Sequence, residues 1–372
     1  MKGRLRELDG LRAIAVLMVV AWHYVPAGDG SIAGGGILYT LCRPGRSGVD
    51  LFFVLSGFLI TSILLEQRGA QNYYRVFYIR RALRILPVYG LMVLALILGR
   101  AFAWDPDLFG GAFPIWTYPL FLQNFAMAQL NTYGPSFMTA TWSLAIEEQF
   151  YLVFPFVVAA VPTRVLPKLL IALLVLMPIL RALSYWHSGF YLPVYVLTPY
   201  RADTLAIGAL IAWAFSHPQV KASLIENAHN VRWLLAGLLA AAPLLWGTSG
   251  ASFSAHMGYW GHAYLTLLYG GVLLAVLTHL NSPWLWPLRS RVAFGVGTIS
   301  YALYLFHLPV LEFLEGRGLA RPVLPVVAFA ISIALSALSY VVIERPCLRF
   351  GRGVRYAPSS NQNETAASGV AS

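Results

Sequence analysis

The chain has 372 residues, of which 58% are hydrophobic and only 11% are charged, whereas a soluble globular protein carries about 25% charged residues. Long apolar runs recur from one end to the other, which excludes a soluble enzyme and indicates a polytopic membrane protein. The net charge of +11 does not indicate nucleic-acid binding, because Lys and Arg stand in short clusters between apolar runs, as the positive-inside rule describes.

Ten apolar segments are each long enough to cross a hydrocarbon core about 30 Å thick. In chain order they cover about residues 11–25, 49–66, 85–103, 141–161, 166–183, 201–216, 232–247, 259–279, 293–313 and 322–342. The predicted fold is therefore all-α, with about ten transmembrane helices in one domain over residues 1–350. The segment 351–372 is rich in Ser, Asn, Thr and Ala, and we expect it to be a disordered cytoplasmic tail.

Two segments are expected to lie along the membrane instead of crossing it. Residues 113–130 are apolar but are interrupted by two prolines, a glutamine and an asparagine. If they form an interfacial or re-entrant segment on the outer face, every later basic cluster falls on the cytoplasmic side. Residues 68–84 carry five arginines interleaved with aromatic residues, which predicts an interfacial helix on that side. Both termini are then cytoplasmic.

The first apolar segment carries two ionisable residues, Arg12 near its start and His23 near its end. They are eleven positions apart, which is about three helical turns, so both lie on one face, roughly 16 Å apart along the axis. A membrane helix normally turns such a face toward a protein interior or a hydrated cavity. On this helix alone, a functional pair and a buried structural histidine with a positive-inside arginine remain equally good interpretations.

Other ionisable side chains interrupt the later apolar segments, and each costs roughly 2.5–3.5 kcal/mol near the centre of a bilayer unless it is paired or hydrated. They are Asp50, Glu147, Glu148, Arg201, Asp203, His307 and Glu344. The predicted helix directions place five groups in the outer half of the membrane: His23, Asp50, Glu147, Glu148 and Arg201. This predicts one polar chamber; the alternative is a set of independent structural ion pairs.

The residue types narrow the chemistry of such a chamber. A neutral histidine beside a carboxylate suits general-base catalysis of acyl transfer to an alcohol. No nucleophile motif is present, and Ser56 with Gly57 is interpreted as a packing position in a helix. No Cys/His set has the spacing of metal ligands, so no metal is expected. A donor that carries phosphates would meet the arginines around Arg80, Arg81 and Arg84, although plain positive-inside topology explains that cluster equally well.

Seven blocks in a fixed order now make the chain resemble the acyltransferase-3 family of bacterial integral-membrane O-acyltransferases. They are Leu8–Ala13 with the Arg-x10-His spacing, Gly48–Phe58, Arg80–Pro87, Trp142–Tyr151, Arg201–Asp203, Ser300–Pro309 and Ile343–Pro346. The resemblance implies a domain that takes an acyl group, usually acetyl, from cytoplasmic acyl-CoA. The acceptor is usually a sugar hydroxyl of a cell-envelope glycan or its lipid-linked precursor.

The resemblance also assigns roles to residues. It implies catalytic roles for His23, Glu147, Glu148 and Asp50, donor binding by Arg12, Arg80, Arg81 and Arg84, and acceptor-binding or structural roles for Tyr151, Arg201, Asp203, Tyr304, His307 and Glu344. No permanently bound cofactor is expected, and acetyl-CoA or another acyl-CoA is a co-substrate. The expected partners are that donor, a glycan or glycolipid acceptor and membrane lipids in a bacterial inner membrane, with no nucleic acid.

The mechanistic hypothesis is that His23 deprotonates the acceptor hydroxyl while Glu147 or Glu148 orients the imidazole. One alternative is a transporter or flippase, which the missing repeat and the lack of paired broken helices disfavour. A second alternative, acylation of a small hydrophobic molecule, fits the residues equally well. Many relatives append an extracytoplasmic esterase-like domain; about 30 residues follow the last span here, so we expect such a relay only with a separate protein.

Overall fold

The computed structural model describes residues 5–25, 36–247, 250–280, 282–320 and 323–358, and the regular elements within these ranges are all helical. The predicted all-α class is confirmed for this part of the chain. The longer helices are α1 (Arg6–Tyr24), α3 (Gly48–Glu66), α4 (Tyr73–Ala101), α7 (Thr141–Ala160), α8 (Leu166–Ser188), α10 (Ala202–Ser216), α12 (Ala228–Ala240), α15 (His262–Thr278), α17 (Arg291–Gly316) and α18 (Leu324–Ser339).

Shorter helices connect or extend these elements. They are α2 (Gly36–Cys42), α5 (Pro106–Phe109), α6 (Gln123–Leu130), α9 (Tyr191–Val196), α11 (Pro218–Glu226), α13 (Ala242–Trp246), α14 (Gly250–His256), α16 (Trp286–Arg289) and α19 (Arg345–Gly353). A π-helical turn at Met257–Gly261 leads into α15, and another at Tyr340–Glu344 joins α18 to α19. Such turns accommodate one extra residue without ending the helix.

Eight helical segments within the described ranges are long and apolar enough to cross a membrane. They are Leu38–Glu66, Tyr73–Ala101, Thr141–Ala160, Leu166–Ser188, Ala228–Trp246, Phe253–Thr278, Arg291–Gly316 and Leu324–Gly353. The other two predicted spans are the helices α1 and α10. The first two turns of α1 carry four charged residues, and α10, with 15 residues, is about 22 Å long.

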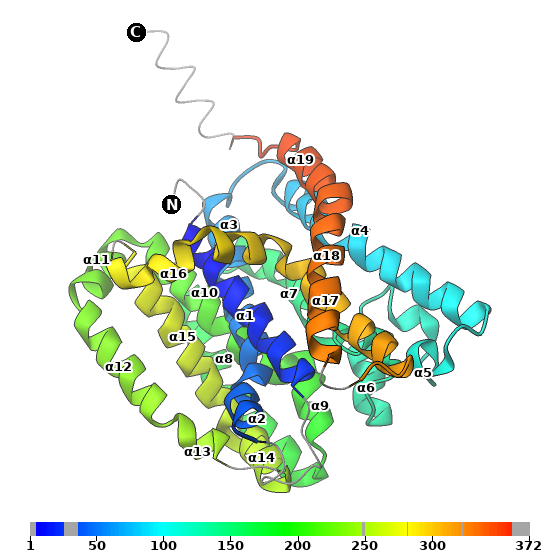
Figure 1. Cartoon of the computed structure of the whole chain (residues 1–372). Coiled ribbons are helices and arrows are strands. Elements are labelled where there is room, and N and C mark those ends of the chain that lie inside the picture. The colour runs from blue at the N-terminus through cyan, green and yellow to red at the C-terminus, as the bar shows by residue number, and fades with distance from the viewer. Residues whose placement is uncertain (1–4, 26–35, 248–249, 281, 321–322, 359–372) are drawn as a thin grey trace.

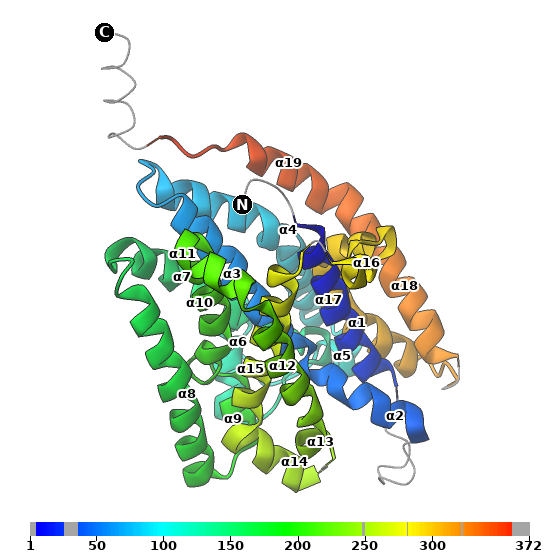
Figure 2. The ribbon, with the colours of Figure 1, turned by 90° about the vertical axis from the view of Figure 1, so that its left-hand side faces the viewer.

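Helices α1 and α10 both pack on α3 inside the bundle (Figures 1 and 2). At the α3–α10 crossing, a Cβ on Gly57 would lie 2.0 Å from the carbonyl oxygen of Leu205, and one on Gly208 would lie 2.0 Å from that of Val54. Only glycine allows the two backbones to approach this closely. On its other side α1 packs against α17, so the helix that carries Arg12 and His23 lies between α3 and α17.

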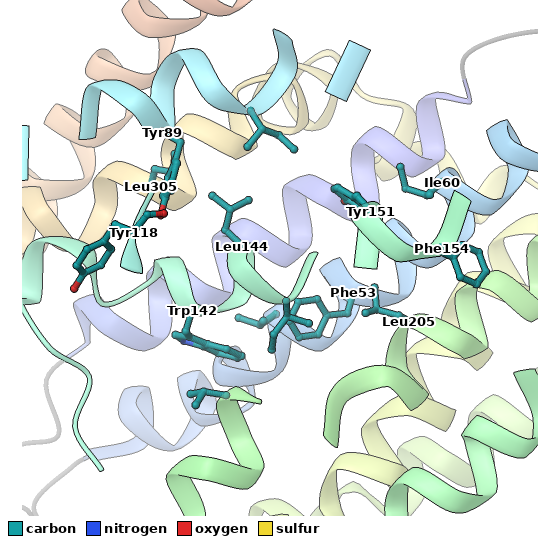
Figure 3. Close-up of a cluster of buried hydrophobic side chains, with 14 of the residues drawn as sticks. Phe53, Ile60, Tyr89, Tyr118, Trp142, Leu144, Tyr151, Phe154, Leu205 and Leu305 are labelled. Carbon is teal, nitrogen blue, oxygen red and sulfur yellow. The ribbon is translucent and has the colours of Figure 1, made fainter. Parts of the chain in front are cut away.

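The main apolar core lies between α3, α4, α7 and α10, and Figure 3 draws 14 of its side chains, ten of them labelled. Phe53 of α3 meets Trp142 of α7 edge to face, with ring centroids 6.2 Å apart, a favoured geometry for aromatic pairs. The start of α1 and the helix α19 lie at the same end of the bundle in both views (Figures 1 and 2). We call this the basic end, because Arg80, Arg81 and Arg352 lie there.

The expected interfacial helix over residues 68–84 is a wrong prediction. Arg68 lies in the turn before α4. The arginines from Arg75 to Arg84 lie in the first turns of α4, which continues without interruption from Tyr73 to Ala101. The reason is local, because Arg, Ala, Leu and Ile sustain a helix and no glycine separates the basic part from the apolar part. Pro87 is accommodated inside the helix. The basic motif is therefore rigidly joined to a membrane span.

Residues 113–130 do not form a spanning helix, in agreement with the prediction. Their longest helix, α6, has eight residues and is about 12 Å long. The two amides that interrupt the apolar run anchor it: Gln123 donates to the carbonyl oxygen of Thr141 at 2.9 Å, and Asn124 donates to that of Val196 at 3.2 Å. Both amides are fully buried, so they bind this segment to α7 and α9.

The start of the predicted tail packs on the domain. Helix α19 continues to Gly353, and the carbonyl oxygen of Val354 accepts a 3.0 Å hydrogen bond from Nε of Arg80. Asn72 hydrogen-bonds to Arg355 and to Ala357. The remainder of the predicted tail, 359–372, lies outside the described residues.

Candidate functional site

A cavity of about 880 Å³ opens at the basic end of the bundle. This is within the size range of small-molecule and cofactor sites. Its wall includes Arg12 of α1, Arg80, Arg81 and Arg84 of α4, and Arg352 of α19. The structure therefore brings together all four arginines that the sequence indicated as donor-binding residues, and it adds a fifth.

The arginines of this cavity are held in different ways. Arg80 donates to Val354 and lies 5.2 Å from the centroid of the Tyr356 ring. Arg12 lies 3.9 Å from a carboxylate oxygen of Asp9 one turn earlier, and its side chain is 22% exposed. In the described part of the chain, none of the three arginines of α4 forms an ion pair. Clustered guanidinium groups without carboxylate partners suit a ligand with phosphates.

A second, narrow cavity of about 90 Å³, which we call the passage, adjoins the inner side of the large cavity. The two spaces share four lining residues, Arg12, Leu59, Arg81 and Arg84. The passage runs between α3, α4, α7 and α17 and is lined farther in by Ser143 and Tyr304. The arginine-lined cavity thus lies next to a cavity in the interior of the bundle.

The carboxylate of Glu147 lies in the wall of this passage. Ser56 donates a 2.5 Å hydrogen bond to Oε1 of Glu147, and the Tyr151 hydroxyl donates to the Ser56 hydroxyl at 3.1 Å. The interpretation of Ser56 as a packing position was incomplete, because its hydroxyl connects two polar groups of the passage. Among the described residues, Oε1 of Glu148 is buried without a hydrogen-bond partner.

His23 lies in the last turn of α1, beside a second histidine. Its Nδ1 is 2.9 Å from the carbonyl oxygen of Val19 and 3.2 Å from Nε2 of His307 on α17. The ring centroids of the two histidines are 5.1 Å apart. Nδ1 of His307 is in turn 2.6 Å from the carbonyl oxygen of Tyr304, whose side chain lines the passage.

The expected orientation of His23 by Glu147 or Glu148 is corrected by this geometry. Among the residues that the structure describes, neither carboxylate forms a hydrogen bond or ion pair with His23. Glu147 projects from the middle of α7 and bonds to Ser56, whereas the partner of His23 comes from α17. The side chain that orients the imidazole is therefore a second, neutral ring.

Asp50 and Arg201 belong to a separate, fully buried network. Arg201 bonds to Asp50 and to His262, and Nδ1 of His262 is 3.6 Å from Oδ1 of Asp50. Next to this group, Arg181 forms a 3.0 Å ion pair with Asp203. The expected single chamber is thus divided into three sites: the histidine pair, the Glu147 passage and this network.

Sequence reasoning missed three residues of these sites, Arg181, His262 and Arg352. Arg181 interrupts an apolar run, as Asp50 does, so the same signal was present. His262 follows a stretch rich in Gly and aromatic residues, and Arg352 lies in a basic cluster that topology explains by itself. Glu344, at the end of the π-helical turn, is 5% exposed, and its Oε1 has no hydrogen-bond partner within the described ranges. No cluster suited to a metal ion occurs in those ranges.

The helices and the arginine-lined cavity define a polytopic membrane protein with an interior site that opens at one end. The chain belongs to the acyltransferase-3 family, whose model, described as an acyltransferase domain, matches residues 5–344. The resemblance inferred from the seven blocks is therefore confirmed, and the match includes each of the predicted site residues.

Curated relatives match along most of this chain. The peptidoglycan O-acetyltransferase OatA of Listeria monocytogenes is 28% identical in an alignment of 368 positions, which covers 93% of this chain and 56% of the relative. The O-acetyltransferase OatA of Staphylococcus aureus is 28% identical, over 92% of this chain and 57% of the relative. The putative peptidoglycan O-acetyltransferase YrhL of Bacillus subtilis is 31% identical, over 91% and 54%. The chain spans about half the length of these relatives. No solved structure matches it.

Proposed function

We propose that this chain is a membrane-bound O-acyltransferase. It moves an acyl group, most simply acetyl, from cytoplasmic acyl-CoA to a hydroxyl of a cell-envelope glycan or its lipid-linked precursor. The observation that carries the proposal is the pair of adjoining cavities that share Arg12, Arg81 and Arg84 and together extend from the basic end to Tyr304. The names of these relatives, which specify peptidoglycan O-acetylation, support acetyl as the group and this glycan as the acceptor class.

The cavities suit the two parts of an acyl-CoA. Phosphates of the nucleotide bind in the large cavity near Arg80, Arg81 and Arg84, which form no ion pair with a carboxylate within the described ranges. The narrow passage then takes the extended pantetheine arm past Arg12. The separation of Arg12 and His23 along α1, about 16 Å, matches an arm of that kind. The hydroxyls of Ser56 and Tyr151, with Glu147, supply polar partners for the amides of the arm.

In the proposed reaction His23 is the general base. Its imidazole takes the proton of the acceptor hydroxyl, and the oxygen attacks the thioester carbonyl. The C–O bond forms as the C–S bond breaks, and the imidazolium returns the proton to the CoA thiolate. A positioned base of this kind contributes about 10²–10⁴-fold to the rate. Asp50 takes no part in these steps, because its carboxylate is bound to Arg201.

The proposed orientation places the basic end in the cytoplasm of a bacterium, with the chain in the inner membrane. The start of α1 and α19 share that end (Figures 1 and 2), which supports cytoplasmic positions for both termini. The arginines of α4 and α19 follow the positive-inside rule in this orientation. The donor then reaches the large cavity directly from the cytoplasm.

The test is the His23→Ala variant of the full chain, expressed in a strain that lacks the chromosomal copy. Base-labile acetyl groups on the purified cell-wall glycan are measured by mass spectrometry, and membrane levels by immunoblot. We expect the acetyl mass to be lost at unchanged protein level. The matched control is His229→Ala, because His229 is exposed on α12, and it should acetylate normally.

Two outcomes contradict the proposal. Normal acetylation by the His23→Ala variant removes the proposed base. Loss of surface glycan itself in the deletion strain, with acetyl groups retained on the glycan that remains, indicates a transporter instead.

A further inference from the structure

We infer that His307 is a positioning residue that holds His23 in the tautomer with a free Nε2. The inference rests on the proposed role of His23 as the base. The proposed partner of His23 is an imidazole on another helix, whereas the sequence predicted that a carboxylate orients this ring. Several atoms next to the two rings can only accept hydrogen bonds, and this decides which nitrogen of each ring carries the hydrogen.

The first step concerns His307 itself. Its Nδ1 lies 2.6 Å from the backbone carbonyl oxygen of Tyr304, and a carbonyl oxygen has no proton to give. Nδ1 of His307 therefore carries the hydrogen. In a neutral imidazole the other nitrogen is then a bare acceptor, and this nitrogen, Nε2, points at His23.

The second step passes this constraint to His23. Its Nδ1 faces two acceptors, Nε2 of His307 at 3.2 Å and the carbonyl oxygen of Val19 at 2.9 Å. Only a hydrogen on Nδ1 satisfies them. The opposite tautomer would direct a lone pair at both acceptors and leave buried polar atoms unpaired, which is unfavourable. Nε2 of His23 therefore keeps its lone pair, as a base requires.

The third step concerns rigidity. His307 is fully buried, and its carbonyl oxygen accepts a 2.8 Å hydrogen bond from the hydroxyl of Tyr24, the residue that follows His23. The same hydroxyl is 2.9 Å from Oγ of Ser332 on α18. Three helices thus hold the two rings in register. When His23 takes a proton, its Nδ1–H donates a charge-assisted bond to His307, which stabilises the imidazolium without a buried negative charge.

Two substitutions of nearly equal size separate positioning from packing. In His307→Gln, Oε1 lies two bonds beyond Cγ, as Nε2 does in histidine, so an acceptor toward His23 is retained. In His307→Asn, the polar atoms lie one bond beyond Cγ and do not reach His23. Both variants of the full chain are assayed in lipid nanodiscs with acetyl-CoA and cell-wall glycan fragments.

We expect His307→Asn to lower kcat by about 10- to 100-fold. This is a smaller loss than in a serine protease whose catalytic histidine is held in the wrong tautomer, where kcat falls by about 10⁴-fold. KM for acetyl-CoA should be unchanged, because His307 does not line the donor cavity. His307→Gln should recover most of kcat. Equal losses in Gln and Asn variants that remain folded would mean that His307 only packs, and the inference would be wrong.

A second measurement needs no variant of His307. The protein is labelled with [15N]histidine, and among its eight histidines the His23 signals are identified by their loss in His23→Ala. Nitrogen shifts then report which ring nitrogen carries hydrogen. We expect hydrogen on Nδ1 and a bare Nε2; hydrogen on Nε2 overturns the inference. An inactive His23→Ala protein together with that result leaves the proposed function standing, whereas an active one removes both.

Discussion

Two buried clusters at one end of α1 and α3 look alike in the sequence but differ in the structure. Asp50, Arg201 and His262 are 2%, 0% and 0% exposed, and their polar groups bind one another. His23 is half-buried, and one of its ring nitrogens is bound while Nε2 has no partner among the described residues. A cluster in which every charge is compensated is suited to a structural role. A cluster with an unpaired nitrogen lone pair is able to accept a proton in a reaction.

The largest expected effect tests the structural half of this comparison. Arg201→Met leaves the Asp50 carboxylate buried without its main partner, which costs about 3–5 kcal/mol. We expect the variant to accumulate poorly in the membrane and to lose its monodisperse peak in size-exclusion chromatography after mild heating. Glycan acetylation should fall only in proportion to the protein that remains.

The matched variant is the double substitution Asp50→Leu with Arg201→Met. Replacing both members of a buried ion pair by apolar residues is often neutral, so the double variant should recover much of the lost stability. If Arg201→Met alone accumulates and unfolds like the parent protein, the network is not structural, and Asp50 becomes a candidate for the reaction again.

The second prediction concerns the arginine-lined cavities, where the donor is proposed to bind. Arg84→Gln removes one guanidinium from the wall that both cavities share. A hydrogen bond to a charged group contributes about 1.5–3 kcal/mol, so we expect KM for acetyl-CoA to rise about 10- to 150-fold, with little change in kcat. Steady-state kinetics at two salt concentrations measure this.

A donor analogue makes that prediction sharper. Acetyl-dephospho-CoA lacks the 3′-phosphate, so the wild-type protein should prefer acetyl-CoA. If this preference is smaller in one arginine variant, that arginine binds the 3′-phosphate. The control is Arg232→Gln, because Arg232 is exposed on α12 and lies outside both cavity walls. An unchanged KM in Arg80→Gln, Arg81→Gln and Arg84→Gln alike would place the donor elsewhere.

The same comparison explains what sequence reasoning reached. Apolar length located the helices, and the arginines of α4 were recognisable because they stand beside apolar runs and share one motif. The partners were not predictable. Asp50 meets Arg201 and His23 meets His307 across 151 and 284 positions, and such pairs depend on how each helix is rotated in the bundle. Hydropathy carries no information on that rotation. The similar depth of the ionisable residues in the membrane therefore suggested one chamber, whereas the packing of the helices forms three separate sites.

The smallest expected effect concerns the hydrogen bonds of the Tyr24 hydroxyl, and it tests whether they do no more than hold the helices of the histidine pair in place. Tyr24→Phe keeps the ring but removes the hydroxyl that bonds to His307 and Ser332, and one hydrogen bond contributes about 0.5–1.5 kcal/mol. We expect a slightly lower thermal midpoint and a kcat reduced by only a few-fold, because the hydrogen bond from Nδ1 of His307 to the Tyr304 carbonyl oxygen still sets the tautomer of His307. Ser332→Ala is the control, since it leaves the bond to the His307 carbonyl in place and should have a smaller effect on both. A Tyr24→Phe loss as large as that of His307→Asn would mean that the position of α17, and not the tautomer, limits the reaction.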